Sequence, residues 1–159
     1  MRRISIALIA LLVLPRFVLS QTKPAEDPTA IVAIIRDAEA KSRAQQWPEA
    51  AALWERALQL NPTHPNGWHN LGVARFYAKD YKAAIPAFEQ AAELGAPTMG
   101  PYFSVYNIAC AHALAGEKEQ AISSLQRALD MGFPNIQAPA KDEDFASIRD
   151  DPRFQKMLG

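Results

Sequence analysis

The sequence predicts an all-α protein, a short solenoid of three helix-turn-helix units closed by a C-terminal capping helix. The main observation is a set of small and bulky residues that recurs three times, after steps of 34 and then 37 residues. The composition agrees, because 159 residues with 49% hydrophobic and 21% charged content are typical of one globular unit. The recurring positions are Ala38, Ala50, Trp54 and Ala57, then Gly72, Ala84, Phe88 and Ala91, then Ala109, Ala121, Leu125 and Ala128.

The N-terminal residues 1–20 have the features of a secretory signal peptide. Arg2 and Arg3 precede an apolar stretch over residues 4–14, and the segment ends at the small residue Ser20. A bilayer-spanning helix needs about 20 apolar residues, more than this stretch provides. We therefore expect cleavage after Ser20 and a periplasmic or secreted protein with no stable membrane insertion. An uncleaved segment that anchors the protein in the inner membrane is the alternative.

Charge argues against a nucleic-acid-binding protein, and cysteine content excludes a protein stabilised by intrachain disulfides. Without residues 1–20 the chain has 14 basic and 17 acidic side chains, a net charge of −3. Nucleic-acid binding is not expected, because it needs clustered lysine and arginine, and here basic residues are scattered among acidic ones. Cys110 is the only cysteine, so no intrachain disulfide can form. Since it lies in an apolar helical run, we expect it to act as a small buried hydrophobe.

Each of the three units is expected to contain two helices, because apolar residues recur in it at helical spacing. Turn signals separate the helices, as at Lys79-Asp80 in the middle unit and at Gly116 in the last. After a polar linker over residues 21–28, the units are expected at about residues 31–64, 65–98 and 102–135.

The middle unit resembles the tetratricopeptide repeat, and the resemblance covers residues 31–134. Gly72 and Ala84 are small because the two helices of such a unit cross there. The resemblance implies a right-handed solenoid of three repeats within residues 29–134. The first unit departs from the pattern, with Ile34 at the position of Trp68. The positions that carry the resemblance are Trp68, Leu71, Gly72, Asp80, Tyr81, Ala84, Phe88, Ala91 and Pro97.

Residues 135–159 resemble the closing segment of a group of bacterial tetratricopeptide-repeat proteins. Asp151 and Pro152 have the residue types of a helix N-cap and a first helical position. Apolar side chains around them, such as Phe145 and Phe154, are expected to cover the open side of the third unit. Solenoids need such caps to remain soluble.

No combination of residues in the sequence points to catalysis, a cofactor or a metal. Cys110 and His112 are two positions apart on a helix and point in different directions, so they cannot form a nucleophile and base pair. His64 and His69 do not share a helix face, and the sequence has neither a zinc-binding pattern nor a phosphate-binding loop. The carboxylates of residues 142–144 are interpreted as a solvated charge run. We expect a protein that is not an enzyme.

The resemblance implies a concave groove lined by the first helices of the units. Repeats that clamp an acidic C-terminal peptide carry lysine and arginine there, which this chain lacks, so that clamp is excluded. Asparagine amides can pair with a peptide backbone, and aromatic rings can bury side chains. Tyr106 and His69 are expected to contact the partner, whereas Phe76 and Phe103 fit the core equally well. The expected groove residues are Ile35, Glu39, His69, Asn70, Val73, Tyr106, Asn107 and Cys110.

These observations predict a non-catalytic adaptor or scaffold of the bacterial cell envelope. Its partner is expected to be an extended peptide or a helix of another protein. Two alternatives remain open. The protein can be a self-associating subunit that stacks the exposed end of its first unit on a second copy, or a membrane-anchored adaptor if residues 1–20 are retained.

Overall fold

The computed structural model describes residues 28–95 and 100–159. The expected signal peptide, its cleavage after Ser20, and the linker as far as residue 27 lie outside the described residues. Within the described ranges, no helix is both long enough and apolar enough to cross a membrane.

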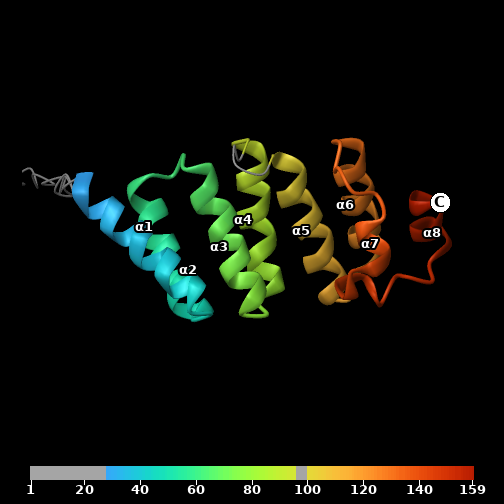
Figure 1. Cartoon of the computed structure of the whole chain (residues 1–159), viewed down its shortest axis with the longest axis horizontal. Helices are drawn as coiled ribbons and strands as arrows, with labels where there is room; N and C mark the ends of the chain where they lie inside the picture. Colours follow the sequence, from blue (N-terminus) through green and yellow to red (C-terminus); the bar gives the residue numbers. More distant parts are fainter. Residues whose placement is uncertain (1–27, 96–99) are drawn as a thin grey trace, which may run out of the picture.

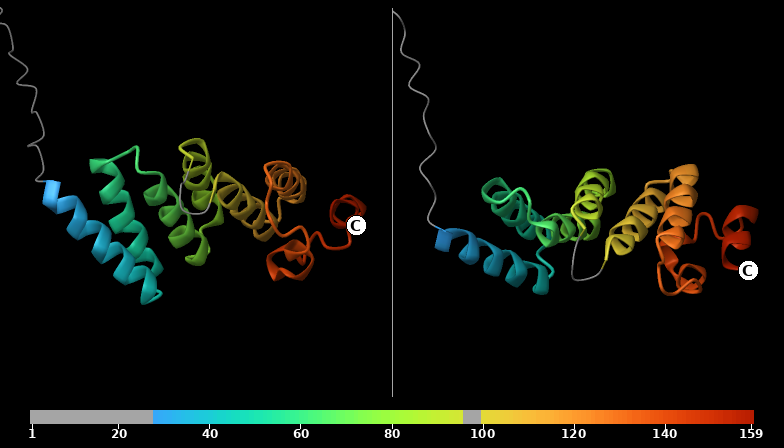
Figure 2. Two further views of the ribbon diagram at one scale, coloured as in Figure 1. Left: turned by 45° about the horizontal axis from the view of Figure 1, so that its top comes forward. Right: turned by 90° about the horizontal axis from the view of Figure 1, so that it is seen from above.

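Six long helices in the described residues form three consecutive pairs, which confirms the predicted all-α solenoid (Figure 1). Each of these helices packs against the next one along the chain, so the pairs stack into an elongated array. The first helix and the C-terminus lie at opposite ends of this array (Figures 1 and 2). The helices are α1 (Pro28–Arg43), α2 (Trp47–Leu60), α3 (Pro65–Tyr77), α4 (Tyr81–Glu93), α5 (Pro101–Leu114) and α6 (Lys118–Asp130).

The turn inside each pair has the same backbone conformation. One residue adopts a left-handed conformation, with φ of 57° at Gln45, 64° at Lys79 and 79° at Gly116. These positions are separated by 34 and 37 residues, the same steps as the core pattern. Only the third turn uses glycine, which adopts this conformation without a steric penalty. The repeat therefore extends to the turns as well as to the core.

The recurring small and bulky residues are all buried, as the solenoid requires. Gly72 shows why one of them must be small. A Cβ atom at this position would lie 2.5 Å from a ring carbon of Phe88, so α3 and α4 are in contact at their crossing. The small residues thus allow close helix crossing, and the bulky ones fill the space beside it.

The C-terminal segment, residues 135–159, covers the open side of the third pair. Phe145, Ile148 and Phe154 are at most 1% exposed and share one cluster with apolar residues of α5 and α6. Oδ1 of Asp151 accepts a hydrogen bond of 2.9 Å from the backbone N–H of Arg153, which confirms the predicted helix cap. We call residues 135–159 the capping segment. It contains α7 (Ala138–Lys141), the 3-10 helix η1 (Glu143–Phe145) and α8 (Pro152–Leu158).

Candidate functional site

A cleft of about 440 Å³ opens between α3, α5 and the capping segment. The first three lining residues of α3 and the three of α5 have the same i, i+1, i+4 spacing, which places each set on one helix face. The two sets are 37 residues apart, one step of the repeat, so both faces meet the same space. The lining residues are His69, Asn70, Val73, Phe76 and Tyr77 of α3, Phe88 of α4, Tyr106, Asn107 and Cys110 of α5, and Asp142 and Asp144 of the capping segment.

Two of the expected groove residues lie outside this cleft. Ile35 is half-buried and packs against the core cluster formed by α1, α2, α3 and α4. Glu39 is exposed and forms an ion pair of 3.7 Å with Arg43, one turn further along α1. The cleft is lined by the second and third helix pairs and the capping segment, and the expectation that the binding groove extends onto α1 stays a prediction.

Asn70 and Asn107 occupy equivalent positions on α3 and α5. Both side chains are half-buried, and within the described residues neither amide forms a hydrogen bond. A partly buried amide without a partner loses hydrogen bonds with water and gains none from the protein. These two amides are therefore available to a bound molecule, each with a donor and an acceptor.

His69 is mainly a core residue that joins α3 to α5. Its side chain is 8% exposed, and its Nδ1 lies 2.9 Å from Oγ of the fully buried Ser104. Its ring packs edge-on against Phe88, with centroids 5.6 Å apart. Burial lowers the pKa of His69, so the ring is neutral at physiological pH. His69 offers the cleft only a small area, and the expectation that it contacts a partner stays a prediction.

Tyr106 is likewise built into the core. It is 8% exposed and stacks on Phe133, with ring centroids 4.4 Å apart, and it meets Phe145 edge-on at 5.5 Å. Its hydroxyl donates a hydrogen bond of 2.6 Å to Oδ2 of Asp142. Burial and this hydrogen bond raise the pKa of Tyr106, so the phenol stays protonated. It attaches the capping segment to α5, and the expectation that Tyr106 also contacts a partner stays a prediction.

The capping segment adds two carboxylates to the cleft, which the sequence did not predict. Residues 142–144 are expected from the sequence to be a solvated charge run, but only Glu143 is exposed. Asp142 and Asp144 are half-buried and line the cleft. Oδ1 of Asp142 accepts a hydrogen bond of 3.0 Å from the backbone N–H of Asp144. The signal in the sequence is this Asp-x-Asp spacing, which is typical of an aspartate that caps the following turn.

The electrostatic environment of Asp144 is unfavourable for its charge. Burial, and then the neighbouring carboxylate of Asp142, raise the pKa of Asp144, although a hydrogen bond from the Cys110 thiol partly offsets this. Burial also raises the pKa of Cys110, so its thiol remains protonated. The cleft therefore holds two adjacent carboxylates of the same charge.

Comparison with known protein families agrees with this geometry. Residues 65–95, which comprise α3 and α4, match a family model described as the tetratricopeptide repeat, and residues 104–131 match a second one with the same description. The second and third helix pairs are therefore similar to the tetratricopeptide repeat. The cleft lies between the first helices of the two matched repeats.

Sequence relatives include much longer proteins. The peroxisomal targeting signal receptors of Pichia angusta and Candida albicans are 26% and 28% identical over 106 residues, 67% of this chain. Human Superkiller complex protein 3 is 29% identical over 84 residues, 53% of this chain. The chain spans 18%, 17% and 5% of the length of these three relatives, respectively.

Solved structures confirm the solenoid fold. The N-terminal domain of the stress-induced protein STI-1 from C. elegans superposes with a TM-score of 0.59 at 16% identity, over 81% of this chain and 92% of that domain. The protein MamA superposes with a TM-score of 0.65 at 19% identity, over 83% of this chain and 78% of its own. At these identities the likeness concerns the fold alone.

The three histidines of the sequence have structural partners among the described residues. Nδ1 of His64 accepts a hydrogen bond of 2.8 Å from the backbone N–H of Gly67 and so caps α3. Nδ1 of His112 lies 2.7 Å from Glu117 in the turn between α5 and α6. The Ser104 hydroxyl beside His69 has no exposed surface, so a substrate cannot reach it. The described cleft thus supports binding and offers no accessible nucleophile and base pair.

One group of described residues has the side-chain types that bind metal ions, namely Cys110, Asp142 and Asp144. Their ligand atoms all lie within 4.8 Å of one another. A soft metal would need the Cys110 thiolate, which the raised pKa of the thiol disfavours, and a hard cation would need more oxygen ligands than two carboxylates supply. These three residues therefore do not form a complete metal site.

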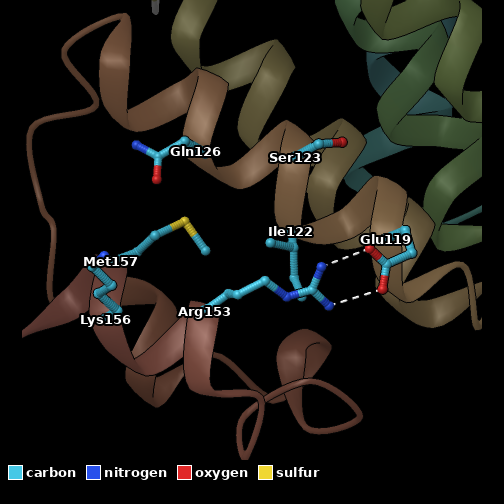
Figure 3. Close-up of a pocket in the computed structure, with 7 residues that line it drawn as sticks. All are labelled: Glu119, Ile122, Ser123, Gln126, Arg153, Lys156 and Met157. Carbon is cyan, nitrogen blue, oxygen red and sulfur yellow. Dashed lines mark hydrogen bonds and ion pairs between the residues drawn. The ribbon is translucent and has the colours of Figure 1, made fainter.

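A second, more open cavity of about 640 Å³ lies between α6 and α8 (Figure 3). Arg153 crosses from α8 to α6, where Nη1 and Nη2 donate hydrogen bonds of 2.6 and 2.8 Å to the two carboxylate oxygens of Glu119. The charged groups at this end of the cavity are thus paired with each other. Unlike the asparagines of the first cleft, they are not available to a partner.

Proposed function

We propose that this protein is a non-catalytic interaction module that binds an extended segment of a partner protein in the cleft between α3 and α5. The observation that carries the proposal is the pair of half-buried amides, Asn70 and Asn107, which have no hydrogen-bond partner among the described residues. A peptide backbone presents alternating N–H and C=O groups, which are the groups that such amides pair with.

The rest of the cleft supports side-chain recognition. Val73 and the half-buried ring of Phe76 provide apolar surface next to the amides. Because the cleft spans two helix pairs only, the area it can bury is small, and we expect affinities in the micromolar range. The fold supports the same function, since tetratricopeptide repeats generally act as protein interaction modules. One set of relatives is also named as receptors of a targeting signal.

The decisive experiment uses peptides selected on the protein itself. Random dodecapeptides displayed on phage are selected against the purified chain, and the recovered sequences are synthesised with a fluorescent label. Dissociation constants are then measured for the wild type, Asn70→Ala and Asn107→Ala. Gln120→Ala serves as a control, because it removes an exposed amide on α6, away from the cleft.

We expect each asparagine variant to bind about three- to tenfold more weakly, the value of one neutral hydrogen bond, with the control unchanged. Peptides that bind both asparagine variants as tightly as the wild type would place the site elsewhere. Failure to select any specific peptide would contradict the proposed function.

We further propose that the protein acts in the bacterial cell envelope, after export and cleavage behind Ser20. The support is the sequence of residues 1–20, with its basic start and short apolar stretch. Expression in a Gram-negative host, followed by cell fractionation and N-terminal sequencing, tests this. A mature chain that begins at Gln21 in the periplasm or the medium supports export. An uncleaved chain in the inner membrane supports an anchored adaptor instead.

A second candidate function, self-association, is favoured by one observation at the other end of the array. Val32 on α1 is 66% exposed, the highest value among the large hydrophobic side chains of the described residues. Stacking of α1 on a second copy would bury it. Sedimentation velocity over a range of concentrations tests this, because Val32→Lys would shift a wild-type dimer to monomer. A wild type that is monomeric throughout removes the candidate.

A further inference from the structure

Building on the proposed function, we propose that the cleft selects a partner segment that carries a lysine or arginine, whose cationic group is bound between Asp142 and Asp144. The capping segment would then have two roles. It closes the solenoid, and it supplies the residues that determine which peptide the repeats accept.

The charge of the cleft is the first argument. Among the described residues, Asp142 and Asp144 are the only acidic groups that line it, and no lysine or arginine does. His69 also lines it, but burial lowers its pKa and keeps it neutral at physiological pH. An acidic cleft attracts cationic segments and repels acidic ones, so charge complementarity indicates the class of partner.

The second argument is that neither carboxylate has a cationic partner among the described residues. Arg149 is close, but its Nη2 donates to the backbone oxygen of Asp142 at 3.1 Å and lies 3.4 Å from the carboxylate of Glu143. Asp142 accepts hydrogen bonds from neutral donors only, the Tyr106 hydroxyl and the Asp144 backbone N–H. Two adjacent, half-buried carboxylates repel each other, and a bound cation would relieve that repulsion.

The third argument is geometric. The ligand atoms of Asp142, Asp144 and Cys110 lie within 4.8 Å of one another. A single ammonium or guanidinium group placed between the carboxylates is therefore within hydrogen-bond reach of both. The amides of Asn70 and Asn107 line the same cleft, so one peptide can use the amides for its backbone and the carboxylates for its basic side chain.

The capping segment is held firmly enough to position these groups. The Tyr106 hydroxyl donates a hydrogen bond to Asp142. The fully buried ring of Phe145 packs against Tyr106 and against Phe154 of α8. Oγ of Ser147 donates a hydrogen bond of 3.2 Å to the backbone oxygen of Ala113 on α5. The carboxylates are thus fixed before a partner arrives, which lowers the entropic cost of binding.

Asp144→Asn is the most informative variant. The asparagine oxygen can still accept the hydrogen bond of the Cys110 thiol, while the negative charge is lost. Asp150→Asn removes the same charge from an exposed position of the capping segment and is the matched control. Both are measured with peptides selected from the random dodecapeptide library, and each peptide is also made with its basic residue replaced by glutamine.

We expect lysine and arginine to be enriched in peptides selected on the wild type but not in those selected on Asp144→Asn. Asp144→Asn should bind the selected peptide about tenfold more weakly or worse, and the wild type should lose as much affinity for the glutamine peptide, because each change removes a charge-assisted hydrogen bond. The affinity of Asp144→Asn for the glutamine peptide should be little lower than either single change gives. At neutral pH the melting temperature of Asp144→Asn should equal or exceed that of the wild type, because an unfavourable charge is removed. A purely structural Asp144 would give a lower melting temperature instead.

Several outcomes would overturn this inference while leaving the proposed function intact. One is a set of selected peptides that depend on Asn70 and Asn107 but show no excess of basic residues. Another is equal affinity for Asp144→Asn and Asp150→Asn. A third is thermal stabilisation by CaCl2 or ZnCl2 that Asp144→Asn abolishes, since this would assign the carboxylates to a metal ion.

Discussion

The hydroxyl of Tyr106 donates a hydrogen bond of 2.6 Å to the carboxylate of Asp142, 36 positions later in the chain. This contact joins the third helix pair to the capping segment at the edge of the cleft. The Tyr106 ring also stacks on Phe133, which lies just after α6, with the two planes only 3° from parallel. One residue therefore contributes both to stability and to the placement of the acidic groups in the cleft.

We expect Tyr106→Phe and Tyr106→Ala to separate these two contributions. Tyr106→Phe keeps the stacking but loses the hydrogen bond, and should lower the free energy of unfolding by about 1–2 kcal/mol. Tyr106→Ala also removes a buried ring and should cost about 3–5 kcal/mol. Urea denaturation of the two variants checks this. Equal losses would mean that the hydrogen bond contributes all of the stabilisation, contrary to the packing.

Gly72 and Phe88 provide a second prediction, about the helix crossing inside the second pair. A Cβ at position 72 would lie 2.5–2.9 Å from three ring carbons of Phe88, so α3 and α4 must move apart in Gly72→Ala. We expect a loss of about 1–3 kcal/mol in the free energy of unfolding, despite the better helix propensity of alanine.

The double variant Gly72→Ala, Phe88→Leu tests the cause of that loss. Because leucine leaves more room opposite position 72, the combined loss should be smaller than the sum of the single losses by 0.5 kcal/mol or more, as for residues in direct contact. Additive losses would show that the effect of Gly72→Ala arises elsewhere than at the Phe88 ring.

The fold was predictable because its determinants are periodic. Ala38, Ala109 and their counterparts are buried at every recurrence, and a repeat of one size requires neighbouring units to stack. The same periodicity places Asn70 and Asn107 at equivalent positions in their helices, and both line one cleft.

The limits of the prediction also have physical causes. Asp142 and Asp144 lie in a segment of short helices without periodicity, and their position depends on a contact with Tyr106 that is distant in sequence. His69 and its neighbour Asn70 differ in burial. The His69 ring is buried against Ser104 in the core, whereas Asn70 is half-buried and lines the cleft. Spacing alone does not distinguish the two.

Asp151 predicts a specific sensitivity to acid. Hydrogen bonds from the side chain and then the backbone of Arg153 lower the pKa of Asp151 from 3.8 to about 2. Because the folded state holds this proton less tightly than the unfolded state, the carboxylate stabilises the fold above pH 4. That contribution is lost as the pH falls from about 4 to 2.

Asp151→Asn should remove this acid sensitivity, since asparagine still caps the helix but does not titrate. The melting temperatures of the wild type and the variant, recorded from pH 2 to pH 6, should converge toward the acid end. The neighbouring variant Asp150→Asn controls for a general change of charge. Parallel curves for the wild type and Asp151→Asn would contradict the assignment.

Removal of residues 144–159 should destabilise the solenoid and promote association. Phe145, Ile148 and Phe154 are almost completely buried against α5 and α6, so their loss exposes the apolar residues beneath them, such as Leu125 and Ile122. Thermal unfolding should show a lower melting temperature, and sedimentation velocity should show a mass that rises with concentration.

Phe154→Ala tests the same role of the capping segment without shortening the chain. Because this ring is 1% exposed, its removal should cost about 3–5 kcal/mol in the free energy of unfolding while α8 keeps its Asp151 cap. If the truncated chain and Phe154→Ala both melted like the wild type, and the truncated chain stayed monomeric, the third repeat would be stable without its cap. The capping segment would then matter only for the carboxylates that it brings to the cleft.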